Sequence, residues 1–67
     1  METFAQRLYD LRTDKEISQA ELARQIGIDN TTVSSWEREE TTPTLPMLIL
    51  LRKFFGVSID DLGIIFG

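Results

Sequence analysis

Apolar residues recur at helical spacing in five short stretches of the chain, and each stretch is bounded by capping residues or helix breakers. In the first stretch Phe4 and Leu8 lie four residues apart, on one face of a helix. Thr3 and Gln6 form a candidate capping box, with the threonine as N-cap. The pattern predicts a first helix over about 3–15.

Two more helices are predicted close together in the middle of the chain. Ser18 and Glu21 form a second capping box, and the helix that follows ends at Gly27, which can adopt a left-handed cap without a Cβ clash. Asp29 is the expected N-cap of the third helix. The third helix has low intrinsic propensity, so tertiary packing must hold it. Its inward residues are Val33 and Trp36.

A fourth helix is predicted after a polar loop. Thr44 is its expected N-cap, and Pro46 is tolerated in its first turn because the first amide groups of a helix lack intrahelical acceptors. Gly56 is a C-terminal stop signal. These limits place the fourth helix at about 45–55.

A short fifth helix is predicted near the end of the chain. Ser58 and Asp61 form its capping box, with Ile59 and Leu62 as inward residues. With this helix, the patterns predict an all-α, compact five-helix fold. We expect residues 1–67 to form a single domain.

The composition narrows the possible function classes. The chain contains no Cys and no His, which excludes disulfides, thiolate and imidazole nucleophiles, and zinc sites with the usual ligands. The chain does not open like a secretory signal, and its longest apolar run is far shorter than the ~20 residues that span a bilayer. We therefore expect a cytoplasmic binding domain that is not an enzyme, with no catalytic residues, no metal, no cofactor and no membrane partner.

The charge balance argues against non-specific nucleic-acid binding. Eleven acidic and seven basic residues give a net charge of -4, whereas non-specific DNA binding depends mostly on positive charge. A DNA-binding function would therefore depend on particular residues.

Three positions between the second and third helices fit a pair of helices that cross at roughly 90–120° through a tight turn. Such a crossing needs a small residue at the contact, a residue that tolerates positive φ in the turn, and an apolar anchor on the second helix of the pair. Ala23, Gly27 and Val33 meet these needs in order. On spacing alone, a DNA-binding motif and a simple corner in a helical bundle remain about equally open.

Five segments of the chain match one family in order and spacing. They read RLYDLR, SQAELARQIGI, TVSSWERE, PTLPMLILL and FFGVSIDDL, and they cover nearly the whole chain. On these segments the chain resembles the phage repressor and Cro, or XRE-type, helix-turn-helix family. The resemblance implies a bacterial or phage-encoded transcriptional regulator, a repressor, that binds double-stranded DNA. It places the helix-turn-helix motif at about 19–38.

The resemblance assigns phosphate contacts to two residues. Gln19, the first residue of the second helix, matches a position that binds a DNA phosphate together with the amide groups of the helix N-terminus. Arg38 matches a basic position that clamps phosphate after the recognition helix. Arg24 and Lys15 are better explained as surface charges.

The resemblance assigns base contacts to the polar face of the third helix. Asn30, Thr31 and Ser35 match positions that reach base edges in the major groove, where Asn can pair with adenine and the Thr methyl can contact thymine. The neighbouring Thr32 and Ser34 could reach phosphate or base. The alternative is an ordinary solvated helix face.

Two charged residues match structural positions of the family. Arg12 of the first helix and Glu37 after the tryptophan correspond to a partly buried ion pair that holds the first helix to the recognition helix. The resemblance therefore implies that Arg12 does not contact DNA.

The chain departs from the family pattern after the recognition helix. The family usually reads Glu-Arg-Gly followed by a basic residue, whereas this chain reads EREETT. Glu39 and Glu40 then lie where the loop normally approaches the sugar-phosphate backbone. Two carboxylates there should repel phosphate and weaken binding.

The C-terminal part of the chain is more apolar than a self-contained domain requires, and such surface usually marks an interface. Family members dimerise through this region, so we predict a homodimer on a palindromic operator, with a dimerisation segment at about 58–67. The alternatives are that the tail packs back on the monomer or covers a further domain or protein partner. The predicted interface residues are Leu50, Phe54, Ile64, Ile65 and Phe66.

A second function class stays open beside DNA binding. A protein-interaction module, such as an antitoxin-like or adaptor domain, could keep the fold and bind DNA weakly or not at all. Glu39 and Glu40 favour this alternative, and the polar third helix argues against it.

Overall fold

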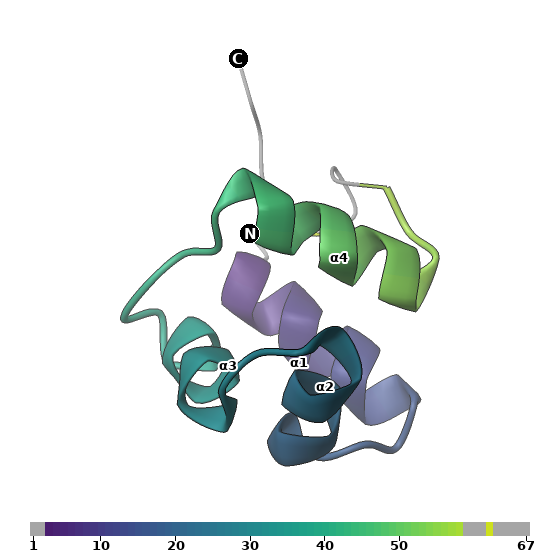
Figure 1. Cartoon of the computed structure of the whole chain (residues 1–67), viewed down its shortest axis with the longest axis horizontal. Helices are drawn as coiled ribbons and strands as arrows, with labels where there is room; N and C mark the ends of the chain where they lie inside the picture. Colours follow the sequence, from purple (N-terminus) through teal and green to yellow (C-terminus); the bar gives the residue numbers. More distant parts are fainter. Residues whose placement is uncertain (1–2, 59–61, 63–67) are drawn as a thin grey trace.

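The computed structural model describes residues 3–58 and 62, and these form four α-helices (Figure 1). The helices are α1 (Phe4–Asp14), α2 (Gln19–Ile26), α3 (Asn30–Glu37) and α4 (Leu45–Phe55). The described residues contain no β-strand, and the predicted all-α class is confirmed. No helix among them combines the length and apolar character that a membrane crossing requires.

The described part of the chain has four helices and not the five that we predicted. The expected fifth helix falls on residues 59–61 and 63–67, which lie outside the described residues. Leu62 of that segment is described, and its side chain is fully buried. The prediction that Leu62 points inward is therefore confirmed. A periodic apolar pattern predicts buried positions more securely than it predicts the secondary structure of the segment.

Side-chain hydrogen bonds cap the first two helices as predicted. Thr3 Oγ1 accepts from the Gln6 amide at 3.2 Å, and Ser18 Oγ accepts from the Glu21 amide at 3.0 Å. Asp29 and Thr44 occupy the N-cap positions of α3 and α4, but neither makes a side-chain capping bond. The last two helices therefore depend on packing for their position.

The chain turns through a left-handed residue after each of the four described helices. Gly27 follows α2 with φ of 78°, and Gly56 follows α4 with φ of 69°. The corresponding residues after α1 and α3 are glutamates, Glu16 with φ of 57° and Glu39 with φ of 60°. This conformation costs a residue that carries a Cβ about 1–2 kcal/mol, so two of the four turns store strain.

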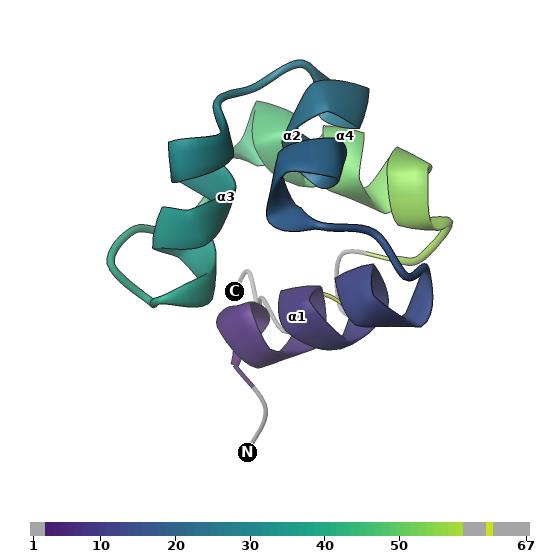
Figure 2. The same ribbon diagram turned by 90° about the horizontal axis from the view of Figure 1, so that it is seen from below.

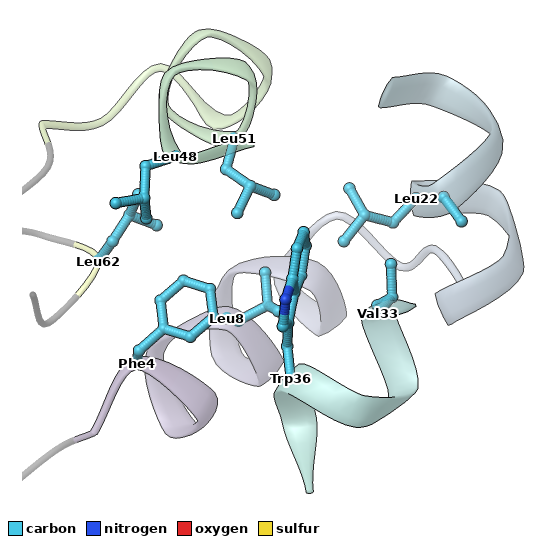
Figure 3. Close-up of a cluster of buried hydrophobic side chains, with 9 residues drawn as sticks. Phe4, Leu8, Leu22, Val33, Trp36, Leu48, Leu51 and Leu62 are labelled. Atoms are coloured by element: carbon cyan, nitrogen blue, oxygen red, sulfur yellow. The ribbon is translucent and has the colours of Figure 1, made fainter. Parts of the chain in front are cut away.

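One apolar core joins the four helices (Figure 3). The ring of Trp36 packs edge-on against Phe4, with centroids 6.1 Å apart and ring planes at 78°. α3 packs on both α1 and α2, which leaves its other face at the edge of the molecule (Figure 2). The buried residues of this core are Phe4, Leu8, Leu22, Ala23, Val33, Trp36, Leu48, Leu51 and Leu62.

Candidate nucleic-acid interface

The three residues predicted to build the turn between α2 and α3 have the expected burial and backbone conformation. Ala23 is only 2% exposed at the helix contact, and Val33 is completely buried. Gly27 has its positive φ in the turn, and a Cβ built on it would meet no atom within 4 Å. The glycine is therefore needed for its backbone conformation and not for space.

The N-terminal half of α3 presents polar groups that are not engaged elsewhere. Asn30 and Thr31 are exposed, and Thr32 is half-buried. Within the described residues, none of these three side chains makes a hydrogen bond. Their amide and hydroxyl groups are therefore available to a ligand.

The C-terminal half of α3 is engaged in contacts within the chain. Arg38 donates from Nε and Nη2 to the Glu40 carboxylate at 3.0 and 3.1 Å, and from Nη1 to Ser34 Oγ at 2.5 Å. The hydrogen bonds with Glu40 raise the pKa of Arg38, and those with Arg38 lower the pKa of Glu40. Two predicted DNA contacts, Ser34 and Arg38, therefore bind each other, and Glu40 neutralises the arginine.

Ser35 is also engaged. Its hydroxyl lies 2.9 Å from the hydroxyl of Thr41, in the loop that leads to α4. This contact borders a depression of about 450 Å³ between α3 and the loop. The depression is lined by Thr31, Thr32, Ser35, Trp36, Thr41, Thr42, Pro43, Thr44 and Met47.

The ion pair that the resemblance implied is present between α1 and α3. Arg12 donates from Nε and Nη2 to the Glu37 carboxylate at 2.6 and 3.0 Å, and from Nη1 to the carbonyl of Ile17 at 2.8 Å. The side chains of Arg12 and Glu37 are only 11% and 7% exposed. The hydrogen bonds that Arg12 donates to Glu37 raise the pKa of Arg12 against the opposing effect of burial.

Gln19 joins this ion pair to the start of α2. Its Nε2 donates to Glu37 Oε1 at 3.1 Å, and the side chain is half-buried. The Glu37 carboxylate of α3 therefore binds both Arg12 of α1 and Gln19, the residue that we expected to contact a phosphate. The sequence did not indicate this link.

The two cations that we interpreted as surface charges each contact another side chain of the chain. Arg24 forms an exposed ion pair with Glu21 one turn earlier in α2. The ammonium group of Lys15 lies 5.4 Å from the ring centroid of Phe54. Neither contact lies on α3.

The predicted dimer surface is partly exposed. Leu50 is 40% exposed, and α4 also exposes Leu45 and Ile49, at 53% and 39%. Phe54 is only partly exposed, because it packs on the core and stacks edge-on against Phe55. The other predicted interface residues, Ile64, Ile65 and Phe66, lie outside the described residues.

Comparison with models of protein families gives a match to the one described as helix-turn-helix, over residues 8–62. That range contains α2, α3 and α4 and most of α1. The chain belongs to the helix-turn-helix family. Membership confirms the resemblance that the five sequence segments indicated.

Similar members of the helix-turn-helix family include transcriptional regulators. The HTH-type transcriptional activator BcrR of Enterococcus faecalis is 39% identical over 59 residues, which cover 88% of this chain and 29% of BcrR. The cryptic phage CTXphi transcriptional repressor RstR of Vibrio cholerae is 34% identical over 59 residues, which cover 88% of this chain and 53% of RstR. The chain thus spans about half or less of these relatives.

The fold is also that of a solved family member. The c2 repressor of phage P22, in a crystal structure with a synthetic operator, superposes with a TM-score of 0.87 and is 34% identical. The match covers 92% of this chain and 94% of that one. The arrangement of four helices is therefore that of a helix-turn-helix repressor domain.

Sequence reasoning missed two features of this helix-turn-helix site. Nothing in the sequence pointed to Thr41 as the partner of Ser35. The left-handed backbone of Glu39 did have a signal, because the family pattern carries glycine at this place. The described residues also contain no group of acidic side chains that could hold a metal ion.

Proposed function

We propose that this chain is the DNA-binding domain of a sequence-specific transcriptional regulator, a repressor that reads an operator in the major groove with α3. The unengaged polar start of α3 carries this proposal, since Asn30 can pair bidentately with adenine and Thr31 can contact a thymine methyl. The P22 c2 relative, which shares the fold, is solved with an operator.

The placement of Gln19 supports a phosphate contact at the start of α2. Its hydrogen bond to Glu37 fixes the amide at the helix N-terminus, where backbone N–H groups and the helix dipole favour an anion. One N–H of the amide binds Glu37, and the other remains for a phosphate oxygen. Arg12 serves this contact indirectly, by holding Glu37.

Base contacts divide unevenly along α3 in this proposal. Asn30, Thr31 and Thr32 read bases or phosphate directly, because their side chains are unengaged. Ser34 already accepts a hydrogen bond from Arg38, and Ser35 already shares one with Thr41, so each hydroxyl has less capacity left for DNA. We therefore expect the strongest sequence preference to come from the N-terminal half of α3.

Selection of bound duplexes from a random pool at low salt tests the proposed function. Wild-type protein should enrich a short motif, and Asn30→Ala should relax the preference at one position, because a bidentate contact is worth about 1–3 kcal/mol of discrimination. Lys53→Gln, at the end of α4 remote from α3 (Figure 1), is the control and should enrich the same motif. Enrichment of no motif by the wild-type protein would refute the proposal.

We also propose that the protein binds a palindromic operator as a homodimer. The exposed Leu50 and the partly exposed Phe54 of α4 support an interface there, with the C-terminal tail as its expected continuation. In such a dimer the two copies of α3 would lie about one DNA turn apart, roughly 34 Å.

A protein-interaction module is the second candidate. The exposed apolar side chains of α4, Leu45, Ile49 and Leu50, favour it, because exposed apolar surface often marks an interface with another protein. The selection experiment distinguishes the two functions, because a DNA-binding regulator should enrich a motif and an adaptor should enrich no duplex.

A further inference from the structure

The guanidinium group of Arg38 is occupied on all three nitrogens. Nε and Nη2 form a two-pronged contact with the Glu40 carboxylate, and Nη1 binds Ser34. The paired edge of a guanidinium is also the edge that binds phosphate bidentately. Glu40 thus fills the place at Arg38 that a DNA phosphate would take.

The backbone after α3 produces this contact. The Glu39 amide donates to the carbonyl of Trp36 at 3.1 Å, and the Glu40 amide donates to the carbonyl of Ser35 at 3.0 Å. With Glu39 left-handed, these two bonds form a Schellman turn. The turn folds the chain back on the end of α3, which brings Glu40 beside Arg38, two residues earlier.

We propose that Glu40 is an intramolecular competitor of DNA phosphate for Arg38 and thereby sets the affinity of the interface. This inference rests on the proposed DNA-binding function. In the free protein the carboxylate holds the arginine in a neutral pair. On DNA a phosphate replaces the carboxylate, and Glu40 is left unpaired close to the backbone. Arg38 therefore contributes less affinity than an unpaired arginine at the same position.

The pair is weak enough to exchange. The side chains of Arg38 and Glu40 are 58% and 56% exposed, and ion pairs this exposed to water add little stability. A phosphate held in place by other contacts can therefore displace the carboxylate. The pair lowers affinity without preventing binding.

Removing the Glu40 carboxylate should also change how the DNA affinity depends on salt concentration. In the wild-type complex the freed Glu40 carboxylate stays close to the DNA backbone and offsets the charge of Arg38, whereas a glutamine leaves that charge intact. One more effective positive charge at the interface releases about one more counterion, so the slope of log K against log salt should steepen by about 0.9.

Four variants isolate the exchange, and fluorescence anisotropy on a selected duplex over a range of salt measures it. Glu40→Gln removes the competitor, and Arg38→Gln and the double variant complete a thermodynamic cycle. Glu39→Gln is the matched control, because it removes the neighbouring carboxylate, which makes no ion pair within the described residues. The three substituted positions, 38, 39 and 40, are exposed, so circular dichroism should show an unchanged fold.

Glu40→Gln should tighten binding about fivefold more than Glu39→Gln, with the steeper salt slope, and the extra gain should vanish in the Arg38→Gln background. If Glu40→Gln gives the same gain with and without Arg38, and Glu39→Gln gives an equal gain, the inference is overturned and only general repulsion remains, with the proposed function intact. Binding of no duplex by the wild type and all variants would refute the proposed function and this inference with it.

A measurement on the free protein tests the pair without DNA. In an NMR titration the carboxyl pKa of Glu40 should lie below its ordinary value and rise in Arg38→Gln, because the arginine holds the carboxylate charged. A carboxyl pKa that is the same in both proteins would show that the pair does not form in solution and would overturn the inference.

Discussion

Glu39 occupies a left-handed turn position with φ of 60°, where its Cβ crowds the backbone. We expect Glu39→Gly to raise the free energy of unfolding by about 0.5–1 kcal/mol, because relief of strain exceeds the added flexibility of the unfolded chain. The midpoint of urea unfolding measures this change. Glu16→Gly, at φ of 57° after α1, should stabilise by a similar amount.

The two glycine variants should differ in DNA binding. Glu39 lies in the turn directly after the recognition helix, so its removal should also tighten binding, whereas we assign Glu16 no contact with DNA. Glu39→Ala separates charge from strain, because alanine keeps the Cβ. An equal gain in stability from alanine and glycine would show that backbone strain is not the cause.

Glu37 is the single carboxylate that holds α1, α3 and Gln19. Glu37→Ala leaves the guanidinium of Arg12 buried without its partner, so we expect the free energy of unfolding to fall by about 2–4 kcal/mol. Thermal melting followed by circular dichroism measures it, and Glu21→Ala, which breaks the exposed pair with Arg24, should change the midpoint far less. An unchanged midpoint in Glu37→Ala would contradict the structural role of the pair.

At the scale of elements, the crossing of α2 and α3 depends on one glycine. Gly27 and Gly56 have similar positive φ, and a Cβ on either would meet no atom within 4 Å. Gly27→Ala and Gly56→Ala should therefore each cost about 1 kcal/mol of conformational strain, measured by urea unfolding. Only Gly27→Ala should also weaken DNA binding, because Gly27 sets the angle of the recognition helix. Equal binding by the two variants would contradict this role.

The elements were largely predictable because their signals are local. The caps Thr3 and Ser18 and the stops Gly27 and Gly56 mark helix ends within a few residues of sequence, and the structure uses all four. The Arg12–Glu37 contact was accessible only through the family resemblance, since 25 residues separate the partners.

The side-chain contacts of the site were less predictable. Arg38 binds Glu40, and Ser35 binds Thr41, only because the left-handed Glu39 folds the chain back over the end of α3. The comparison with the family pattern treated Glu40 as a repulsive charge and Arg38 as a cation available to phosphate. The turn at Glu39 brings Arg38 and Glu40 together, and no periodic pattern in the sequence indicates that contact.

At the scale of the whole molecule, the net charge of -4 says little about the candidate interface. Arg38 and Glu40 cancel beside α3, and Arg12 and Glu37 cancel beneath it. The start of α3 offers neutral amide and hydroxyl groups. We infer that the interface depends on hydrogen bonds and helix N-termini more than on net charge. We therefore expect one subunit to bind DNA weakly and a second subunit, bound to a neighbouring half-site, to increase the affinity.

Two substitutions of an exposed apolar residue by aspartate test the proposed dimer, one inside the predicted interface and one outside it. Wild-type protein at tens of micromolar should sediment as a dimer, and Leu50→Asp should sediment as a monomer, because a carboxylate in the apolar interface would lose its hydration. Tyr9→Asp, at a 49% exposed apolar position on α1, should remain dimeric. The monomeric Leu50→Asp should also lose preference for two half-sites one DNA turn apart while it still enriches a single half-site. A monomeric wild type, or loss of the dimer in both variants, would contradict an interface centred on Leu50.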